Sequence, residues 1–253
     1  AIRYFVGTQV LVVVDGSYWE SWGREAKLPA HKMEGFRHAY NRAPYRNLTL
    51  GLNTLLSLFG SDLDWYCYCE YDVLFAADTF KKELEEAIKK NIWCIGNDHR
   101  VGEYKFPYLE RIIGEEIGPS HYLLGCCVFY SGAFLRKLQE INFFEKFLFC
   151  TSEFNKGFFP GYEEQGGYDF GEHLYPTLAA HYGGQVSQFA SWNRVFEHWH
   201  GNFKQYPMRW QPELTFEDNY ANAAIMHPVK TDNDLRWFHR TKRQRIRRMN
   251  GEL

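Results

Sequence analysis

Apolar and polar positions along the chain follow two patterns, short unbroken apolar runs and longer stretches with helical spacing. Residues 10–14 form an apolar run that ends at Asp15, and this predicts a buried strand leading into a turn. Over residues 48–59 the apolar positions recur at helical spacing, which predicts an amphipathic helix. Asp78 is a favourable N-cap residue, so we expect a second helix over residues 78–90.

Three more strands and two more helices complete the pattern. The expected strands cover residues 65–71, 92–95 and 122–130, and the expected helices cover 131–141 and 169–181. Pro176 is expected to kink or interrupt the last helix. Short buried strands that alternate with helices predict an α/β fold with a mostly parallel central sheet. We expect one domain over residues 1–230 and a basic, helical tail over residues 231–253.

Composition narrows the class of protein. A chain of 253 residues is long enough for a full core, and its net charge of −2 gives no general argument for a nucleic-acid or membrane partner. The six cysteines mostly lie in apolar runs, which predicts reduced, buried thiols in a cytoplasmic protein. No run of about 18 apolar residues is present, so no membrane-spanning helix is expected, and no signal peptide is expected either.

An acidic pair follows the aromatic strand at residues 65–71. Glu70 and Asp72 are two positions apart, so in an extended chain their side chains point to the same side. Two carboxylates at one point suit Mg²⁺ or Mn²⁺, which usually also hold substrate phosphates. The simpler interpretation is a solvated strand end. The metal site is favoured because ligands of open α/β sheets bind beyond the carboxyl ends of strands, where Asp15 is also expected.

A second motif lies near residue 230. His227 follows an apolar stretch and precedes Lys230 by three positions. An imidazole can complete a manganese site built on carboxylates, and an ammonium group can neutralise a diphosphate. On its own this histidine would be an ordinary loop residue. The upstream acidic pair is what makes a ligand role for His227 worth considering.

The order of these features resembles the GT-A glycosyltransferases. The shared features are a strand ending in aspartate, an acidic pair after a buried strand, a small-residue strand-to-helix turn at Ser131-Gly132, a carboxylate on a helix, and a late His-x-x-Lys motif. The resemblance covers residues 9–230 by order of elements. It implies a Rossmann-like α/β/α sandwich that transfers a hexosyl or deoxyhexosyl group from a nucleotide-diphosphate sugar, with Mn²⁺ or Mg²⁺, as in polysaccharide biosynthesis.

The same resemblance implies roles for individual residues. It places Glu70 and Asp72 at the ribose and the metal, His227 on the metal, Lys230 beside the diphosphate and Asp15 near the base. The implied acceptor is a hydroxyl of a saccharide or of a lipid-linked sugar. The chain departs from the family in having fewer residues than usual between the first strong strand and the acidic pair, which affects the base-binding residues most.

Two carboxylates are candidates for the catalytic base. Transfer with inversion needs a base that deprotonates the acceptor hydroxyl. Asp169 and Glu172 stand at the start of a predicted helix, after a glycine-containing segment that could close over the donor. Asp-x-x-Glu is equally a capping-box-like helix start that requires no chemistry. The sequence leaves Asp169, Glu172 and this structural alternative open.

Two further segments suggest partners. Aromatic residues gather over residues 192–210 and could form either an acceptor wall that stacks on sugar rings or a small satellite core. Seven Lys or Arg residues over 236–248 could form a basic helix that contacts anionic lipid, or a solvated terminal helix. The rest of the chain shows no basic face, so nucleic-acid binding is not predicted. The alternative functions are a nucleotidyltransferase acting on sugar phosphates and a non-catalytic carbohydrate-binding protein.

Overall fold

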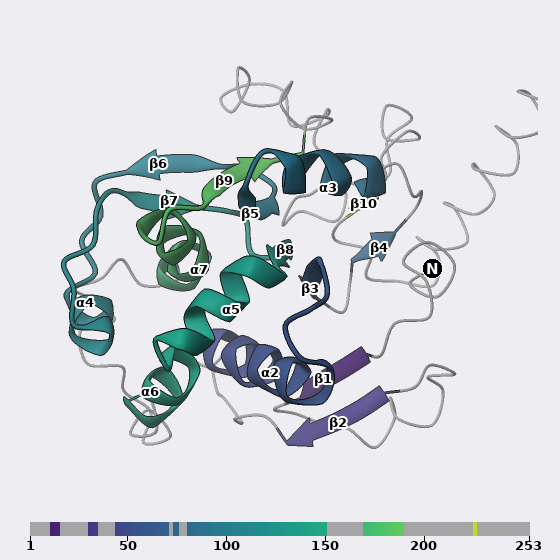
Figure 1. Ribbon diagram of the computed structural model, residues 1–253, viewed down its shortest axis with the longest axis horizontal. Helices are drawn as coiled ribbons and strands as arrows, with labels where there is room; N and C mark the ends of the chain where they lie inside the picture. Colours follow the sequence, from purple (N-terminus) through teal and green to yellow (C-terminus); the bar gives the residue numbers. More distant parts are fainter. Residues whose placement is uncertain are drawn as a thin grey trace, which may run out of the picture.

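A four-stranded mixed sheet is the centre of the computed structural model (Figure 1). The structure describes residues 11–15, 30–34, 44–70, 73–75, 80–150, 169–189 and 225–226. The strands are β1 (Leu11–Asp15), β2 (Ala30–Glu34), β3 (Trp65–Cys69), β4 (Leu74–Phe75), β5 (Ile92–Gly96), β6 (Arg100–Gly102), β7 (Ser120–Tyr122), β8 (Cys127–Ser131), β9 (Gln185–Gln188) and β10 (Ile225–Met226). The helices are α2 (Pro44–Phe59), α3 (Phe80–Lys89), α4 (Pro107–Ile113), α5 (Gly132–Glu140), α6 (Phe143–Cys150) and α7 (Asp169–His181).

The central sheet has the strand order β3-β8-β5-β9. β8 is antiparallel to both of its neighbours, and β5 is parallel to β9. β3, β5 and β9 therefore run in one direction and β8 in the other. The mixed α/β class is as predicted, but a mostly parallel sheet does not describe these four strands. The reason is the connection from β5 to β8, which contains the antiparallel β6–β7 ladder instead of a crossover helix and so returns the chain in the opposite direction.

Smaller ladders flank this sheet. β1 and β2 pair in parallel, with Asp15 opposite Glu34 at the ends of the two strands. β4 and β10 pair antiparallel, with Phe75 opposite Ile225 and Leu74 opposite Met226. The β4–β10 ladder joins segments 150 residues apart in sequence, and neither strand was predicted.

The two faces of the central sheet carry separate cores. Along β8, Val128 and Tyr130 face the larger core, whereas Cys127 and Phe129 face the smaller one, as strand alternation requires. The larger core is completed by α2, α4, α5, α6 and α7, and the smaller one by α3, β4 and β10. The five cysteines whose side chains are described are free thiols, in agreement with the prediction.

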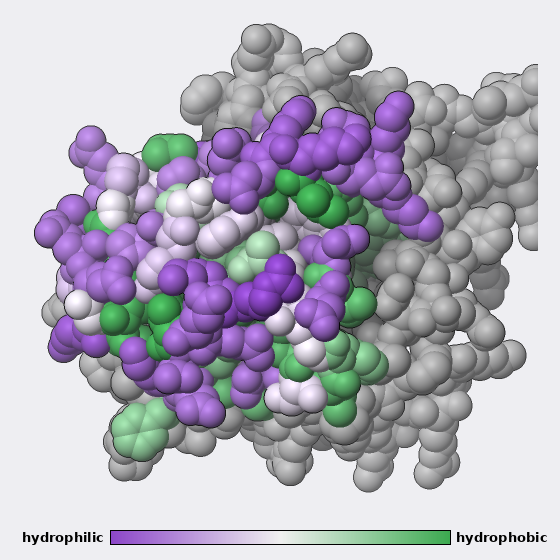
Figure 2. Space-filling model, in the orientation of Figure 1, coloured by the Kyte–Doolittle hydropathy of each residue, from purple (hydrophilic) through white to green (hydrophobic). Residues whose placement is uncertain are grey.

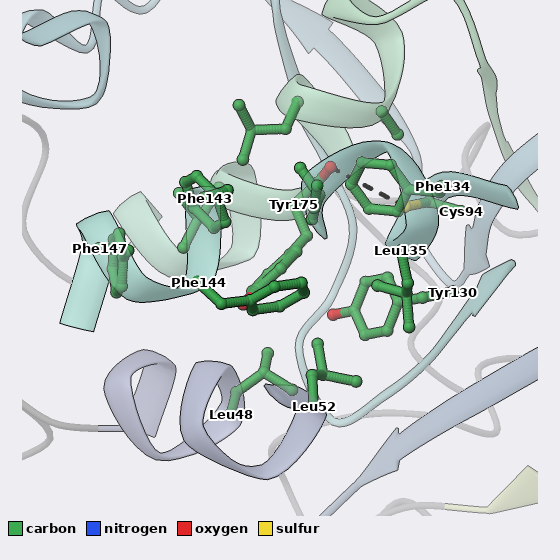
Figure 3. Close-up of a cluster of buried hydrophobic side chains, with 14 of the residues drawn as sticks. Leu48, Leu52, Cys94, Tyr130, Phe134, Leu135, Phe143, Phe144, Phe147 and Tyr175 are labelled. Carbon is green, nitrogen blue, oxygen red and sulfur yellow. Dashed lines mark hydrogen bonds between the residues drawn. The ribbon is translucent and has the colours of Figure 1, made fainter. Parts of the chain in front are cut away.

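A buried hydrogen bond links two helices within the larger core. Tyr175 of α7 lies at the centre of the cluster in Figure 3, surrounded by side chains of α2, α6 and β8. Its hydroxyl donates to Thr49 Oγ1 of α2 at 2.7 Å, and both residues are fully buried. This contact fixes α7, and the residues that precede Tyr175 on it, relative to the rest of the domain.

Several predicted elements are confirmed and one is divided. α7 spans the predicted residues 169–181 and continues through Pro176 without interruption. Ser131 caps α5 as expected, because its hydroxyl oxygen accepts a hydrogen bond from the Phe134 amide at 3.2 Å. The single strand expected over 122–130 is instead β7 and β8, separated by a turn.

Polar side chains dominate the face of the molecule seen in Figure 2, with apolar ones in separate patches. Among the residues with described side chains, the exposed large apolar ones are Leu58, Phe59, Leu63, Ile88, Val101, Tyr104 and Phe149. Within the part of the chain that the structure describes, no helix has the length and apolar character needed to cross a bilayer.

Candidate functional site

One edge of the central sheet collects polar residues from several elements. Because β8 is antiparallel to its neighbours, its first residues lie at the edge where β3, β5 and β9 end. We call this the carboxyl edge. We call Leu124-Gly125-Cys126, which immediately precedes β8, the edge turn.

Each residue of the edge turn makes a hydrogen bond to a different part of the chain. The Leu124 amide donates to the carbonyl oxygen of Asn97, just after β5, at 2.8 Å. The Gly125 amide donates to Glu172 Oε1 on α7 at 2.7 Å. The carbonyl oxygen of Cys126 accepts from the Glu70 amide, just after β3, at 2.9 Å. The edge turn therefore brings together Glu70 and Glu172, which were predicted from segments about 100 residues apart.

Pro176 explains why Glu172 is the docking point of α7. Proline has no amide hydrogen, so the carbonyl four residues earlier in a helix, that of Glu172, loses its helical donor. The Leu123 amide donates to this carbonyl oxygen instead, at 3.1 Å. Glu172 thus binds the segment beside the edge turn through its backbone and the turn itself through its side chain. The helix tolerates Pro176 because the orphaned carbonyl has found a tertiary partner.

The pKa values of two tyrosines, Tyr68 and Tyr122, respond to the charges of Glu70 and Glu172. Burial, followed by the charge of Glu172, raises the pKa of Tyr122. Burial also raises the pKa of Tyr68, with the charge of Glu70 as the next cause and that of Glu172 as a smaller one. Tyr68 therefore lies within electrostatic range of both carboxylates, which supports a shared site at the carboxyl edge.

An ion pair between a buried aspartate and an exposed arginine lies beside Tyr122. Asp98, only 2% exposed, accepts two hydrogen bonds from Arg100, at 2.7 and 2.5 Å. The guanidinium carbon of Arg100 lies 5.3 Å from the centre of the Tyr122 ring. Burial raises the pKa of Asp98, and the charge of Arg100 opposes this shift. Asp98 has a backbone φ of 57°, a left-handed conformation that aspartate tolerates better than most residues.

Two histidines lie next to this ion pair. His99 Nε2 is 3.1 Å from His121 Nδ1, so one ring donates a hydrogen bond to the other. Burial, together with repulsion from His121, lowers the pKa of His99 to about 4. Burial also lowers the pKa of His121, so both rings are neutral at neutral pH.

Of the acidic pair, Glu70 lies among the described residues and Asp72 does not. The strand ends at Cys69, two residues before the expected end, and the Val73 amide donates to the Glu70 carbonyl oxygen at 3.2 Å. β4 begins with Leu74, which is opposite Met226, the last residue of β10. Along the sequence, Asp72 precedes Leu74 by two positions, and His227 directly follows Met226.

The remaining predicted site residues are placed as follows. Asp72, His227 and Lys230 lie outside the described residues, as do the aromatic segment and the basic tail. Asp169 is the first residue of α7, as predicted. Asp15 ends β1, which belongs to a separate ladder from Glu70. Among the described residues, no group of three or more His, Cys, Asp or Glu side chains is arranged to hold a metal ion.

Sequence reasoning assigned no role to several residues at the carboxyl edge. Asn97 and Asp98 follow β5 directly, so the criterion that selected Glu70, a polar residue after a buried strand, would have selected them too. Tyr122 was hidden inside one long predicted strand, and His121 directly precedes it. No comparable sequence signal could have paired Tyr122 with Glu172.

No protein-family model matches the chain. No curated protein matches it either.

Proposed function

We propose that the protein is a metal-dependent glycosyltransferase that moves a sugar from a nucleotide-diphosphate donor to a hydroxyl of a saccharide or lipid-linked acceptor. The observation that carries this proposal is the meeting of Glu70 and Glu172 at the edge turn. One was predicted as a donor-binding residue and the other as a catalytic base. Their convergence at a carboxyl edge is the arrangement expected for ligand binding by an α/β sheet.

The β4–β10 ladder gives a second line of support. It pairs Leu74 with Met226, so the chain segments leading to Asp72 and His227 start from the same end of one ladder. The hydrogen bond from the Val73 amide to the Glu70 carbonyl oxygen links this ladder to the carboxyl edge. This pairing supports our proposal that Glu70, Asp72 and His227 belong to one site.

The three proposed metal ligands have the side-chain chemistry that a hard divalent cation binds. Glu70 is the member of this set that the structure describes, and its carboxylate, with Asp72 and His227, would offer the oxygen and imidazole donors that Mn²⁺ and Mg²⁺ accept. When bound there, the cation would neutralise charge that develops on the leaving diphosphate.

We assign the role of catalytic base to Glu172 in preference to Asp169. Its carboxylate accepts a hydrogen bond from the Gly125 amide at 2.7 Å. This bond holds the carboxylate at the carboxyl edge. In this role Glu172 would accept the proton of the acceptor hydroxyl as that oxygen attacks the sugar.

A thermal-shift screen tests the proposal. The full chain would be heated with UDP-, GDP- and dTDP-sugars, each with and without Mn²⁺. A donor present at a hundredfold excess over its Kd should stabilise the fold by about 2.7 kcal/mol, or roughly 5–10 °C in Tm for a chain of this size. The shift should require Mn²⁺, and the same donor should release its nucleoside diphosphate when an acceptor is added.

Asp72→Asn should abolish the Mn²⁺-dependent shift and donor turnover. Asp62→Asn is the matched control, because Asp62 is an exposed aspartate that precedes the same strand, β3. This control should behave as the wild type. Full turnover by the Asp72→Asn variant would refute the metal site. Pyrophosphate release from a nucleoside triphosphate and a sugar phosphate would instead identify a nucleotidyltransferase.

A further inference from the structure

The side chain of Asn97 is a buried hydrogen-bond donor that the fold leaves unsatisfied. Asn97 is 1% exposed, and its Nδ2 has no hydrogen-bond partner among the described residues. Buried amide groups in folded proteins nearly always have a partner, because leaving one unpaired is costly. An unpaired amide therefore calls for an explanation, such as a ligand or a trapped water.

The position of Asn97 points to a ligand. Its carbonyl oxygen accepts from Leu124 of the edge turn, so Asn97 belongs to the same hydrogen-bonded group as Glu70 and Glu172. The preceding residue, Gly96, accepts from the Phe189 amide after β9. Backbone bonds to two neighbouring segments thus fix the position of Asn97 at the carboxyl edge.

The charges of the carboxyl edge restrict the kind of ligand atom. Glu70, Asp98 and Glu172 contribute carboxylates there, with Arg100 paired to Asp98. A phosphate oxygen placed directly against this group would be repelled. A neutral hydroxyl oxygen would not, and it can accept from an uncharged amide.

We propose that the Asn97 amide donates a hydrogen bond to a hydroxyl oxygen of the sugar in the bound nucleotide-sugar donor, and so contributes to sugar specificity. This inference rests on the proposed function. It assigns the residue a role in recognising the transferred sugar, separate from holding the nucleotide and its diphosphate. A site that has a buried donor for a substrate hydroxyl discriminates strongly against ligands that lack the hydroxyl.

Isothermal titration of the full chain with Mn²⁺ tests this role. The probes are the nucleotide sugar chosen by the thermal-shift screen and its parent nucleoside diphosphate, which lacks the sugar. Asn97→Ala should weaken binding of the nucleotide sugar about tenfold, equivalent to about 1.4 kcal/mol, and should change binding of the nucleoside diphosphate less than twofold. Asn91→Gly, at the opposite end of β5, is the matched control and should change neither affinity by more than twofold.

A second variant distinguishes a ligand role from a structural one. Asn97→Leu has nearly the same shape but no unsatisfied donor, so the ligand-free protein should melt at the wild-type temperature or above while sugar-nucleotide affinity still falls. A lower melting temperature with unchanged affinity would show that Nδ2 holds a buried water, and would overturn the inference. Equal weakening of both probes by Asn97→Ala would also overturn it. If the wild type binds no nucleotide sugar, the proposed function fails as well, whereas wild-type binding with an unaffected Asn97→Ala variant defeats this inference alone.

Discussion

Replacing Glu172 separates the structural and catalytic contributions of its carboxylate. Glu172→Ala removes the acceptor of the Gly125 amide. A hydrogen bond to a charged group contributes about 1.5–3 kcal/mol, and a buried polar group left unpaired costs about 1–3 kcal/mol. Allowing for the partial exposure of Glu172, we expect Glu172→Ala to lower the free energy of unfolding by about 3 kcal/mol. Glu172→Gln keeps an oxygen acceptor but loses the charge, so it should cost about 1 kcal/mol.

Urea denaturation at neutral pH, followed by tryptophan fluorescence, measures both values. Glu110→Ala is a matched control, because Glu110 Oε1 accepts from the Ile117 amide at 3.0 Å, a carboxylate-to-backbone bond made by residues outside the carboxyl edge. This control should lose stability but keep donor turnover, whereas Glu172→Gln should keep most stability and lose turnover. Ordinary surface substitutions change the free energy of unfolding by no more than about 0.5 kcal/mol. A change within that limit for Glu172→Ala would refute the proposed anchoring of the edge turn.

Three further predictions concern the fold. Thr49→Val should lower the free energy of unfolding by about 2 kcal/mol because it leaves the buried Tyr175 hydroxyl unpaired, and Tyr175→Phe should lower it by about 1 kcal/mol. The double variant should lose less than the sum of these two values. Urea unfolding of the wild type and the three variants measures this coupling, and strict additivity would contradict it. Gly184→Ala should cost at least about 2 kcal/mol by the same measurement, because a Cβ atom there would lie 2.2 Å from the Trp93 ring; a wild-type unfolding midpoint would show that this packing is looser than described. His99 has a pKa of about 4 in the folded protein, against an ordinary value of 6.5. Between these two pH values the unfolded chain therefore binds more protons than the folded protein. The contribution of the neutral ring to stability is present above pH 6.5 and is lost as the pH falls towards 4. Partial exposure limits that contribution to about 1–2 kcal/mol, and a His99→Gln variant with the same fall in stability between pH 7 and pH 4.5 as wild type would contradict it.

Local signals in the sequence were sufficient for some of the elements, among them β3, which leads to Glu70. The apolar run before Glu70 gave β3, the helical spacing at residues 48–59 gave most of α2, and the serine at 131 gave the start of α5. Each of these depends on side chains within a few residues of one another, which is the range over which capping and periodicity act.

Long-range pairing could not be predicted in the same way. β4 and β10 are two residues each, too short for any periodic signal, and they are stabilised by partners 150 residues away. The antiparallel direction of β8 depends on the β6–β7 ladder, whose strands are three residues each and too short for a periodic signal. Pro176 was expected to disturb α7, and only the tertiary bond from Leu123 shows why the helix continues.

The convergence of Asp72 and His227 on one cation is the central claim. Crystals of the full chain grown with Mn²⁺ and a nucleoside diphosphate would test it directly, because anomalous scattering locates manganese independently of any model of the protein. The proposal predicts a manganese peak within about 2.5 Å of a carboxylate oxygen of Asp72 and of an imidazole nitrogen of His227, with diphosphate oxygens completing its coordination. A nucleotide bound without manganese, or manganese bound away from both residues, would contradict the account.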